Sequence, residues 1–97
     1  MDSLSNIKTV LTQFKTESGR EYGIISIGIF GSFAQGKGTP ISDIDIVVKL
    51  KKQNLFNIIG IKQDLEEKLK TAVDIISYRD SMNQFLKKRI DREAVYV

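Results

Sequence analysis

Three aspartates on two predicted strands are the residues of this chain best suited to chemistry. Asp43 and Asp45 stand two apart in S-D-I-D-I-V-V, where the β-branched apolar neighbours indicate a strand. Residues two apart on a strand point to the same face, with Cα atoms roughly 6.5–7 Å apart. Two carboxylates held in this way can share hard divalent cations such as Mg²⁺, which takes oxygen ligands.

Asp74 is expected to be the third member of this acidic group. It stands in A-V-D-I-I-S, an otherwise apolar stretch in which an unpaired buried charge would be costly. If this strand lies beside the first acidic one, the three carboxylates meet at one site, where Asp74 can orient a metal-bound hydroxyl and accept its proton. In the alternative interpretation, Asp43 caps a turn, Asp45 lies on the exposed face of an edge strand, and Asp74 is solvated at the sheet edge.

Gly31 and Ser32 follow a predicted buried strand and are candidates for binding phosphate. Backbone N–H groups where a helix begins favour anions, a serine hydroxyl adds a donor, and a glycine lets a phosphate approach the main chain. A glycine–serine pair alone mostly marks turns, and the sequence has neither the G-x-x-x-x-G-K-[ST] phosphate loop nor a dinucleotide fingerprint. The ten residues between Ser32 and Asp43 allow the turn and the acidic pair to face one another.

The composition excludes several kinds of site and indicates a single domain over residues 1–97. The chain has no cysteine and no histidine, which excludes disulfides, thiolate and imidazole metal sites, histidine bases and Ser-His-Asp triads. Acid–base or metal chemistry must therefore use carboxylates. A net charge of +3 permits a phosphate-bearing ligand, and nucleic acid is not expected as a partner. Since no signal-peptide pattern and no apolar stretch of bilayer length is seen, the expected location is the cytoplasm, without a membrane partner.

The first half of the chain is expected to place the glycine–serine turn at the end of a central strand. A helix over 3–18, with Ser3 or Ser5 as N-cap and Gly19 as its stop, precedes an apolar strand over 22–30. Within that strand, a glycine at position 28 indicates that another backbone or a ligand comes close.

The remaining elements are expected to alternate in the same way. Ser32 would cap a short helix through Gln35, and a strand over 43–50 carries the acidic pair. A helix from about 54 to 70 and a strand over 72–77 follow.

A last helix, capped by Asp80 or Ser81, and a short strand over 94–97 would complete the chain. The order α-β-α-β-α-β-α predicts an α/β (α+β) fold with a single mixed sheet of three to four strands flanked by helices. The apolar residues expected to face inward are Leu55, Ile58, Ile61, Leu65 and Leu69 in the third helix and Met82, Phe85, Leu86 and Ile90 in the last.

The combined motif resembles a known superfamily. Gly31-Ser32, ten intervening residues, Asp43-Ile44-Asp45 and a later strand aspartate at Asp74 are similar to the nucleotidyltransferases that include DNA polymerase β. The segments G-S-F-A-Q-G and S-D-I-D-I-V-V resemble those of the minimal nucleotidyltransferases in particular. These are stand-alone domains that are often encoded beside a small helical HEPN protein. The resemblance covers nearly the whole chain and implies the nucleotidyltransferase fold.

The resemblance also implies a reaction and a role for each site residue. It implies Mg²⁺-dependent transfer of AMP from ATP to an acceptor hydroxyl, which in antitoxin members is a tyrosine of the HEPN-type toxin. Asp43 and Asp45 would hold two Mg²⁺ ions, and Asp74 would hold the catalytic one and help to deprotonate the acceptor. Gly31 and Ser32 would bind the β- and γ-phosphates. Positioning and charge neutralisation suffice for phosphoryl transfer, so a chain without histidine or cysteine can perform it.

The sequence departs from the family pattern in the G-S-x-A-R-G motif, and two other functions remain as alternatives. Many relatives read G-S-x-A-R-G, whereas here Gln35 occupies the arginine position and Phe33 another position that is often basic. Loss of an arginine removes a bidentate phosphate clamp, a role that Lys37 could take. The alternatives are a catalytically weak or inactive nucleotide-binding antitoxin that acts by contact, and a nucleotidyltransferase acting on a small molecule.

Overall fold

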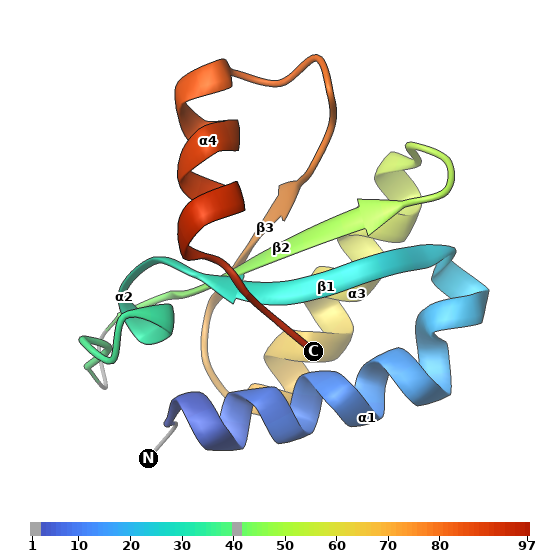
Figure 1. Cartoon of the computed structure of the whole chain (residues 1–97). Helices are drawn as coiled ribbons and strands as arrows, with labels where there is room; N and C mark the ends of the chain where they lie inside the picture. Colours follow the sequence, from blue (N-terminus) through green and yellow to red (C-terminus); the bar gives the residue numbers. More distant parts are fainter. Residues whose placement is uncertain (1–2, 40–41) are drawn as a thin grey trace.

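Eight elements of secondary structure follow one another in the computed structural model, which describes residues 3–39 and 42–97. The four strands form one sheet in the order β3-β2-β1-β4. Strands β2 and β3 are parallel, whereas β1 is antiparallel to both β2 and β4, so the predicted mixed sheet flanked by helices is confirmed. In chain order the elements are α1 (Leu4–Tyr22), β1 (Ile24–Phe30), α2 (Gly31–Ala34), β2 (Ile44–Leu50), α3 (Leu55–Leu69), β3 (Val73–Ser77), α4 (Gln84–Glu93) and β4 (Val95–Tyr96) (Figure 1).

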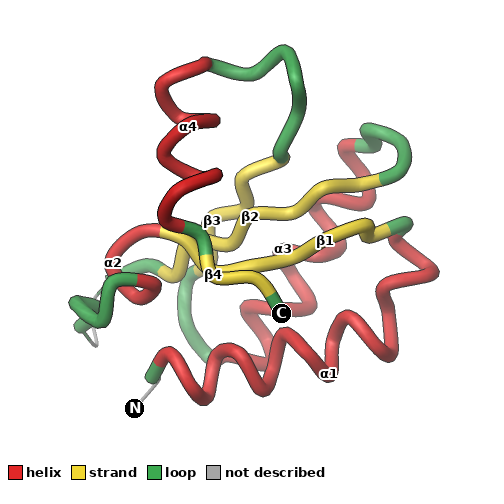
Figure 2. The backbone as a smooth tube through the Cα atoms, in the orientation of Figure 1, coloured by secondary structure: helices red, strands yellow, loops and turns green. Residues whose placement is uncertain are grey.

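Helices cover both faces of the sheet, with α1 and α3 on one face and α4 on the other (Figures 1 and 2). Alternate residues of β2 point to opposite faces: Ile44, Ile46 and Val48 pack toward α1 and α3, whereas Val47 packs toward α4. Phe30 lies in the same small cluster as Val47, together with Ile90 of α4. The odd-numbered positions of β2 therefore share a face with α4.

The first helix begins where predicted but runs one turn further. Ser3 is its N-cap, and its hydroxyl oxygen accepts a hydrogen bond from the backbone of the first turn (3.2 Å). The prediction that Gly19 ends the helix was wrong, because Gly19 is buried inside it and Gly23, at φ +69°, forms the left-handed C-cap. The extra turn brings Tyr22 onto the Phe14 ring, with centroids 6.0 Å apart. Tertiary packing therefore overrides the local stop signal.

Two of the apolar residues expected to face inward are exposed instead. Leu55 is 71% exposed and Phe85 is 84% exposed. Each lies in the first turn of its helix, whereas the first fully buried residues of α3 and α4 are Ile61 and Ile90. The helical period alone could not show where along each helix contact with the sheet begins.

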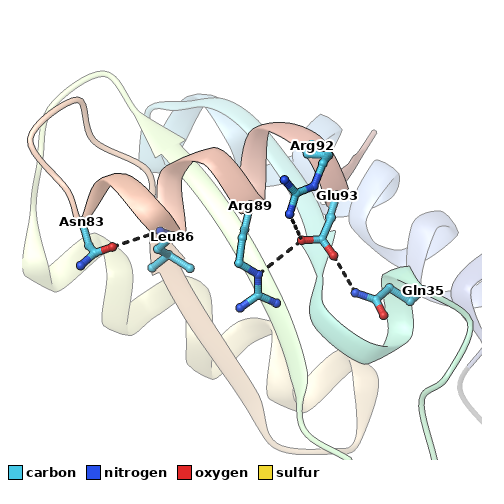
Figure 3. A network of polar contacts seen from close by, with 6 residues as sticks. All are labelled: Gln35, Asn83, Leu86, Arg89, Arg92 and Glu93. Atoms are coloured by element: carbon cyan, nitrogen blue, oxygen red, sulfur yellow. Dashed lines mark hydrogen bonds and ion pairs between the residues drawn. The ribbon is translucent and has the colours of Figure 1, made fainter.

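The last helix begins a few residues later than expected. Asn83, and not Asp80 or Ser81, is the N-cap of α4, and its side-chain oxygen accepts a hydrogen bond from the backbone N–H of Leu86 (3.1 Å; Figure 3). Asparagine satisfies a first-turn donor as well as aspartate or serine does, so residue type could not decide between these neighbouring positions.

The short strand β4 explains the glycine within β1. Gly28 pairs with Tyr96, and a Cβ atom at position 28 would lie 2.7 Å from the carbonyl oxygen of Val95. The expectation that another backbone approaches Gly28 closely is therefore confirmed. This pairing also fixes the C-terminal end of α4 beside the second half of β1.

Within the ranges 3–39 and 42–97, no helix is both long enough and apolar enough to span a bilayer.

Candidate active site

Asp45 and Asp74 lie side by side on the face of the sheet that α4 covers. They are partners in the parallel register of β2 and β3, and on its other side Asp45 pairs with Phe30 of β1. Residues two apart on a strand point to the same face of the sheet. Val47 and Ile76, which lie two residues after Asp45 and Asp74, pack in the cluster beneath α4, so the two aspartates lie on that face as well. The expectation that the two acidic strands are neighbours is confirmed.

Asp43 lies just before β2, where it is exposed to solvent. It is two residues from Asp45, and after burial and the charge of Asp74 its negative charge is the third cause that raises the pKa of the Asp45 carboxyl. The strand begins at Ile44 and not at Asp43, which leaves the Asp43 carboxylate at the open end of the sheet. Sequence alone predicted this pair but placed both members inside the strand.

Gly31 lies directly against the Asp45 side chain. A Cβ atom at position 31 would overlap the Asp45 carboxylate oxygen Oδ2, and Gly31 has a φ of +74° that L side chains rarely adopt. Ser32, the second residue of α2, is half-buried. It is not the N-cap that the sequence predicted, because α2 begins two residues earlier than expected and Phe30 is its N-cap. The backbone carbonyl of Ser32 accepts a hydrogen bond from Lys37 N (2.8 Å), which closes the turn.

The local charge makes this site suited to a cation. The pKa of Asp45 is raised by burial first, and then by the negative charges of Asp74 and Asp43. Three carboxylates without a counter-charge repel one another, and their oxygens are the ligands that Mg²⁺ prefers. In the described part of the chain, no group of three or more such side chains is already arranged to hold a metal ion. The oxygen donors of these three residues fit Mg²⁺ by their chemistry, although their side chains do not form a ready-made metal site.

A pH titration of stability checks the raised pKa. An acid whose folded-state pKa is above its unfolded value favours folding at low pH, and this contribution is lost as the pH rises through the folded-state pKa. Asp45→Asn cannot ionise, so in metal-free buffer we expect it to melt at a higher temperature than the wild type at pH 7. The difference should shrink as the pH falls below the ordinary aspartate pKa of about 4. A difference that grows toward acid pH would contradict the raised pKa.

The sequence analysis missed a pair of side chains that fix the backbone in front of Asp74. Glu66 Oε2 accepts a hydrogen bond from Val73 N (3.0 Å), Lys62 Nζ donates to the carbonyl oxygen of Val73, and the two side chains are 3.5 Å apart. The Val73 N–H lowers the pKa of Glu66. Their i,i+4 spacing is visible in the sequence, but it is equally typical of a solvent-exposed helix face.

Comparison with known proteins gives the family. A family model described as "Polymerase beta, Nucleotidyltransferase" matches residues 6–97. The protein named "Putative protein adenylyltransferase MJ0126", from Methanocaldococcus jannaschii, is 35% identical over 98 residues, which cover 100% of both chains. Protein adenylyltransferase MntA of Thermococcus cleftensis is 34% identical over 98 residues, which cover 100% of this chain and 98% of the relative.

Solved structures agree with this assignment. One described as a "putative minimal nucleotidyltransferase" matches with a TM-score of 0.82 and 27% identity, over 97% of this chain and 95% of that one. A structure of a tri-AMPylated Shewanella oneidensis HEPN toxin in complex with MNT antitoxin shares the fold, with a TM-score of 0.68 and 19% identity over 96% of this chain and 70% of that one. With a family match over nearly its whole length, the chain belongs to the polymerase β nucleotidyltransferase family and is a nucleotidyltransferase of the minimal type.

Proposed function

We propose that this nucleotidyltransferase is a protein adenylyltransferase that uses Mg²⁺ to transfer AMP from ATP to a tyrosine hydroxyl of a HEPN-type partner, and so acts as its antitoxin. The observation that carries the proposal is the register of Asp45 beside Asp74, with Gly31 against the Asp45 carboxylate. This arrangement brings the acidic group and the glycine–serine turn to one place on the sheet.

The three aspartates would hold the metal. Asp43 and Asp45 would share two Mg²⁺ ions, and Asp74 would be a ligand of one of them. When bound, the ions supply charge neutralisation for the phosphates of ATP and acidify the acceptor hydroxyl. Burial and then the charges of Asp74 and Asp43 raise the pKa of Asp45, and bound cations would relieve the repulsion between these charges.

The transfer is a substitution at the α-phosphorus of ATP. The tyrosine oxygen forms a bond to this phosphorus while the bond to the oxygen that bridges the α- and β-phosphates breaks, and pyrophosphate leaves with the electron pair. Asp74 takes the phenol proton, and Gly31 and Ser32 hold the β- and γ-phosphates. The Asp74 side chain is exposed, which supports an acceptor presented by another protein.

The class of acceptor is proposed from the relatives. Relatives at 34–35% identity over the full length carry the name protein adenylyltransferase, and a structure with the same fold contains an AMPylated HEPN toxin. A partner-borne tyrosine also fits an open site, because Asp43 and Asp74 are both exposed to solvent. The reaction is proposed to take place in the cytoplasm, where ATP and Mg²⁺ are available.

Intact-mass spectrometry of the partner tests the proposal. The HEPN-type protein encoded nearby is incubated with this chain, ATP and Mg²⁺, and we expect its mass to rise by one or more AMP units, mapped to tyrosine by peptide sequencing. With Asp74→Asn, which removes the proton acceptor, the mass gain should disappear.

Two other outcomes of this experiment would favour the alternative functions. An unmodified partner that is nevertheless neutralised would favour an antitoxin acting by contact. A small molecule that gains AMP while the partner does not would favour the small-molecule enzyme.

A further inference from the structure

A polar network at the C-terminal end of α4 lies beside the turn that follows β1 (Figure 3). Glu93 Oε1 accepts a hydrogen bond from Gln35 Nε2 (2.9 Å), and Gln35 is the C-cap of α2. Glu93 Oε2 lies 3.4 Å from both Arg89 Nε and Arg92 Nη2. A single carboxylate therefore joins two arginines of α4 to the short helix that opens with Gly31.

Arg89 is the member of this network that packs on the sheet. Its guanidinium carbon lies 5.4 Å from the centroid of the Phe30 ring, within the range of a cation–π contact. Phe30 immediately precedes Gly31 and is the register partner of Asp45. Arg89 is thus held next to both parts of the candidate site, the glycine–serine turn and the acidic strand.

Arg89 keeps most of its hydrogen-bonding capacity in this position. Only its Nε contacts Glu93, and its two Nη groups donate to no residue within 3–39 and 42–97. The side chain is 54% exposed. An exposed ion pair of this kind is weak and exchangeable, whereas a guanidinium binds phosphate oxygens with two parallel hydrogen bonds.

The charges of the network favour an anion. Two arginines share one carboxylate, so the network carries a surplus positive charge next to Phe30 and the turn that follows it. Beyond the charge neutralisation that Mg²⁺ would supply, a cationic side chain near the turn attracts the phosphates of a nucleoside triphosphate. Gln35 is neutral and already bonded to Glu93, so it offers no such charge.

We propose that Arg89 binds the β- and γ-phosphates of the nucleoside triphosphate when they lie on the Gly31–Ser32 turn. On binding, Arg89 exchanges its contact with Glu93 for the phosphate oxygens, while Glu93 remains bonded to Gln35 and Arg92. The proposal rests on the proposed function in taking ATP as the AMP donor. Together with Gly31 and Ser32, Arg89 then increases the affinity of this chain for a triphosphate over a monophosphate.

Nucleotide titration by calorimetry tests the role of Arg89. With Mg²⁺ present, we expect Arg89→Ala to weaken ATP binding on the order of tenfold or more, as for loss of a charge-assisted hydrogen bond. AMP lacks the β- and γ-phosphates, so Arg89→Ala removes no contact with it. The affinity of the variant for AMP should therefore stay within about twofold of the wild-type value. Lys88→Ala is the matched control, because it removes the same charge from the next position of α4, at an exposed side chain.

A second variant guards against loss of the fold. Arg89→Lys keeps the charge but not the two parallel donors, and we expect a smaller loss of ATP affinity with AMP unchanged. Thermal melting of each variant shows that it is folded. The role of Arg89 is overturned if ATP affinity is unchanged in both Arg89 variants, if AMP affinity falls as much as ATP affinity, or if Lys88→Ala has the same effect.

The test separates this inference from the proposed function. If no protein is AMPylated but Arg89→Ala still weakens ATP selectively, the acceptor is wrong and the phosphate contact stands. If the partner is AMPylated and the Arg89 variants bind ATP as tightly as the wild type, only the proposed phosphate contact is wrong.

Discussion

Replacing Gly31 with alanine is expected to remove about 99% of AMP transfer while the protein stays folded, since a displacement of about 1 Å at a reacting group can cost on the order of 10²-fold in rate. The new Cβ atom would overlap Oδ2 of the Asp45 carboxylate. A short side chain can rotate away from such a contact, so the main result is a displaced carboxylate and not an unfolded chain. A steady-state transfer assay together with thermal melting measures both effects.

Gly36→Ala is the matched control for this substitution. Gly36 has a φ of +72°, close to the +74° of Gly31, but a Cβ atom there would meet nothing within 4 Å. Both variants should therefore lose about 1–2 kcal/mol of stability from left-handed backbone strain, and only Gly31→Ala should lose activity. Equal activity in the two variants would show that the contact between Gly31 and Asp45 is irrelevant to the reaction.

Asp45→Asn is expected to lower the rate of AMP transfer on the order of 10³-fold, about 4 kcal/mol of transition-state stabilisation. Asn keeps the shape of the side chain but removes the charge that Mg²⁺ requires, in the position between Phe30 and Asp74. The fold should persist, because the substitution relieves repulsion from Asp74 and Asp43. The measurement is the single-turnover rate at saturating ATP and Mg²⁺.

A binding measurement separates a lost metal site from other causes. Mg²⁺ should raise the melting temperature of the wild type, because a ligand that binds only the folded state stabilises it, and removal of the metal with a chelator should reverse the shift. Asp45→Asn should show a much smaller shift. Asp80→Asn is the control. Asp80 precedes α4, its side chain is 94% exposed, and it forms an ion pair with Lys87. If Asp80→Asn loses the Mg²⁺ shift as well, the shift reports general charge and not the acidic site.

The sequence alone was sufficient for the types and order of the elements. Apolar runs and helical spacing are local patterns, so they predicted the strands that carry Asp45 and Asp74 and the helix between them. The spacing of Gly31, Asp43 and Asp45 likewise indicated a phosphate turn beside an acidic pair. Element ends were less accurate, as the extension of α1 to Tyr22 shows, because tertiary contacts decide how far each helix runs.

Register and long-range contacts were decided only by the tertiary structure. The sequences of the two strands do not predict that Asp45 pairs with Asp74, because this register depends on how β2 and β3 align in the sheet. The hydrogen bond between Gln35 and Glu93 spans 58 positions of sequence, and the contact of Arg89 with the Phe30 ring is equally long-range. Patterns in a sequence report which face of an element is buried, whereas the partner on that face depends on the packing of the whole sheet.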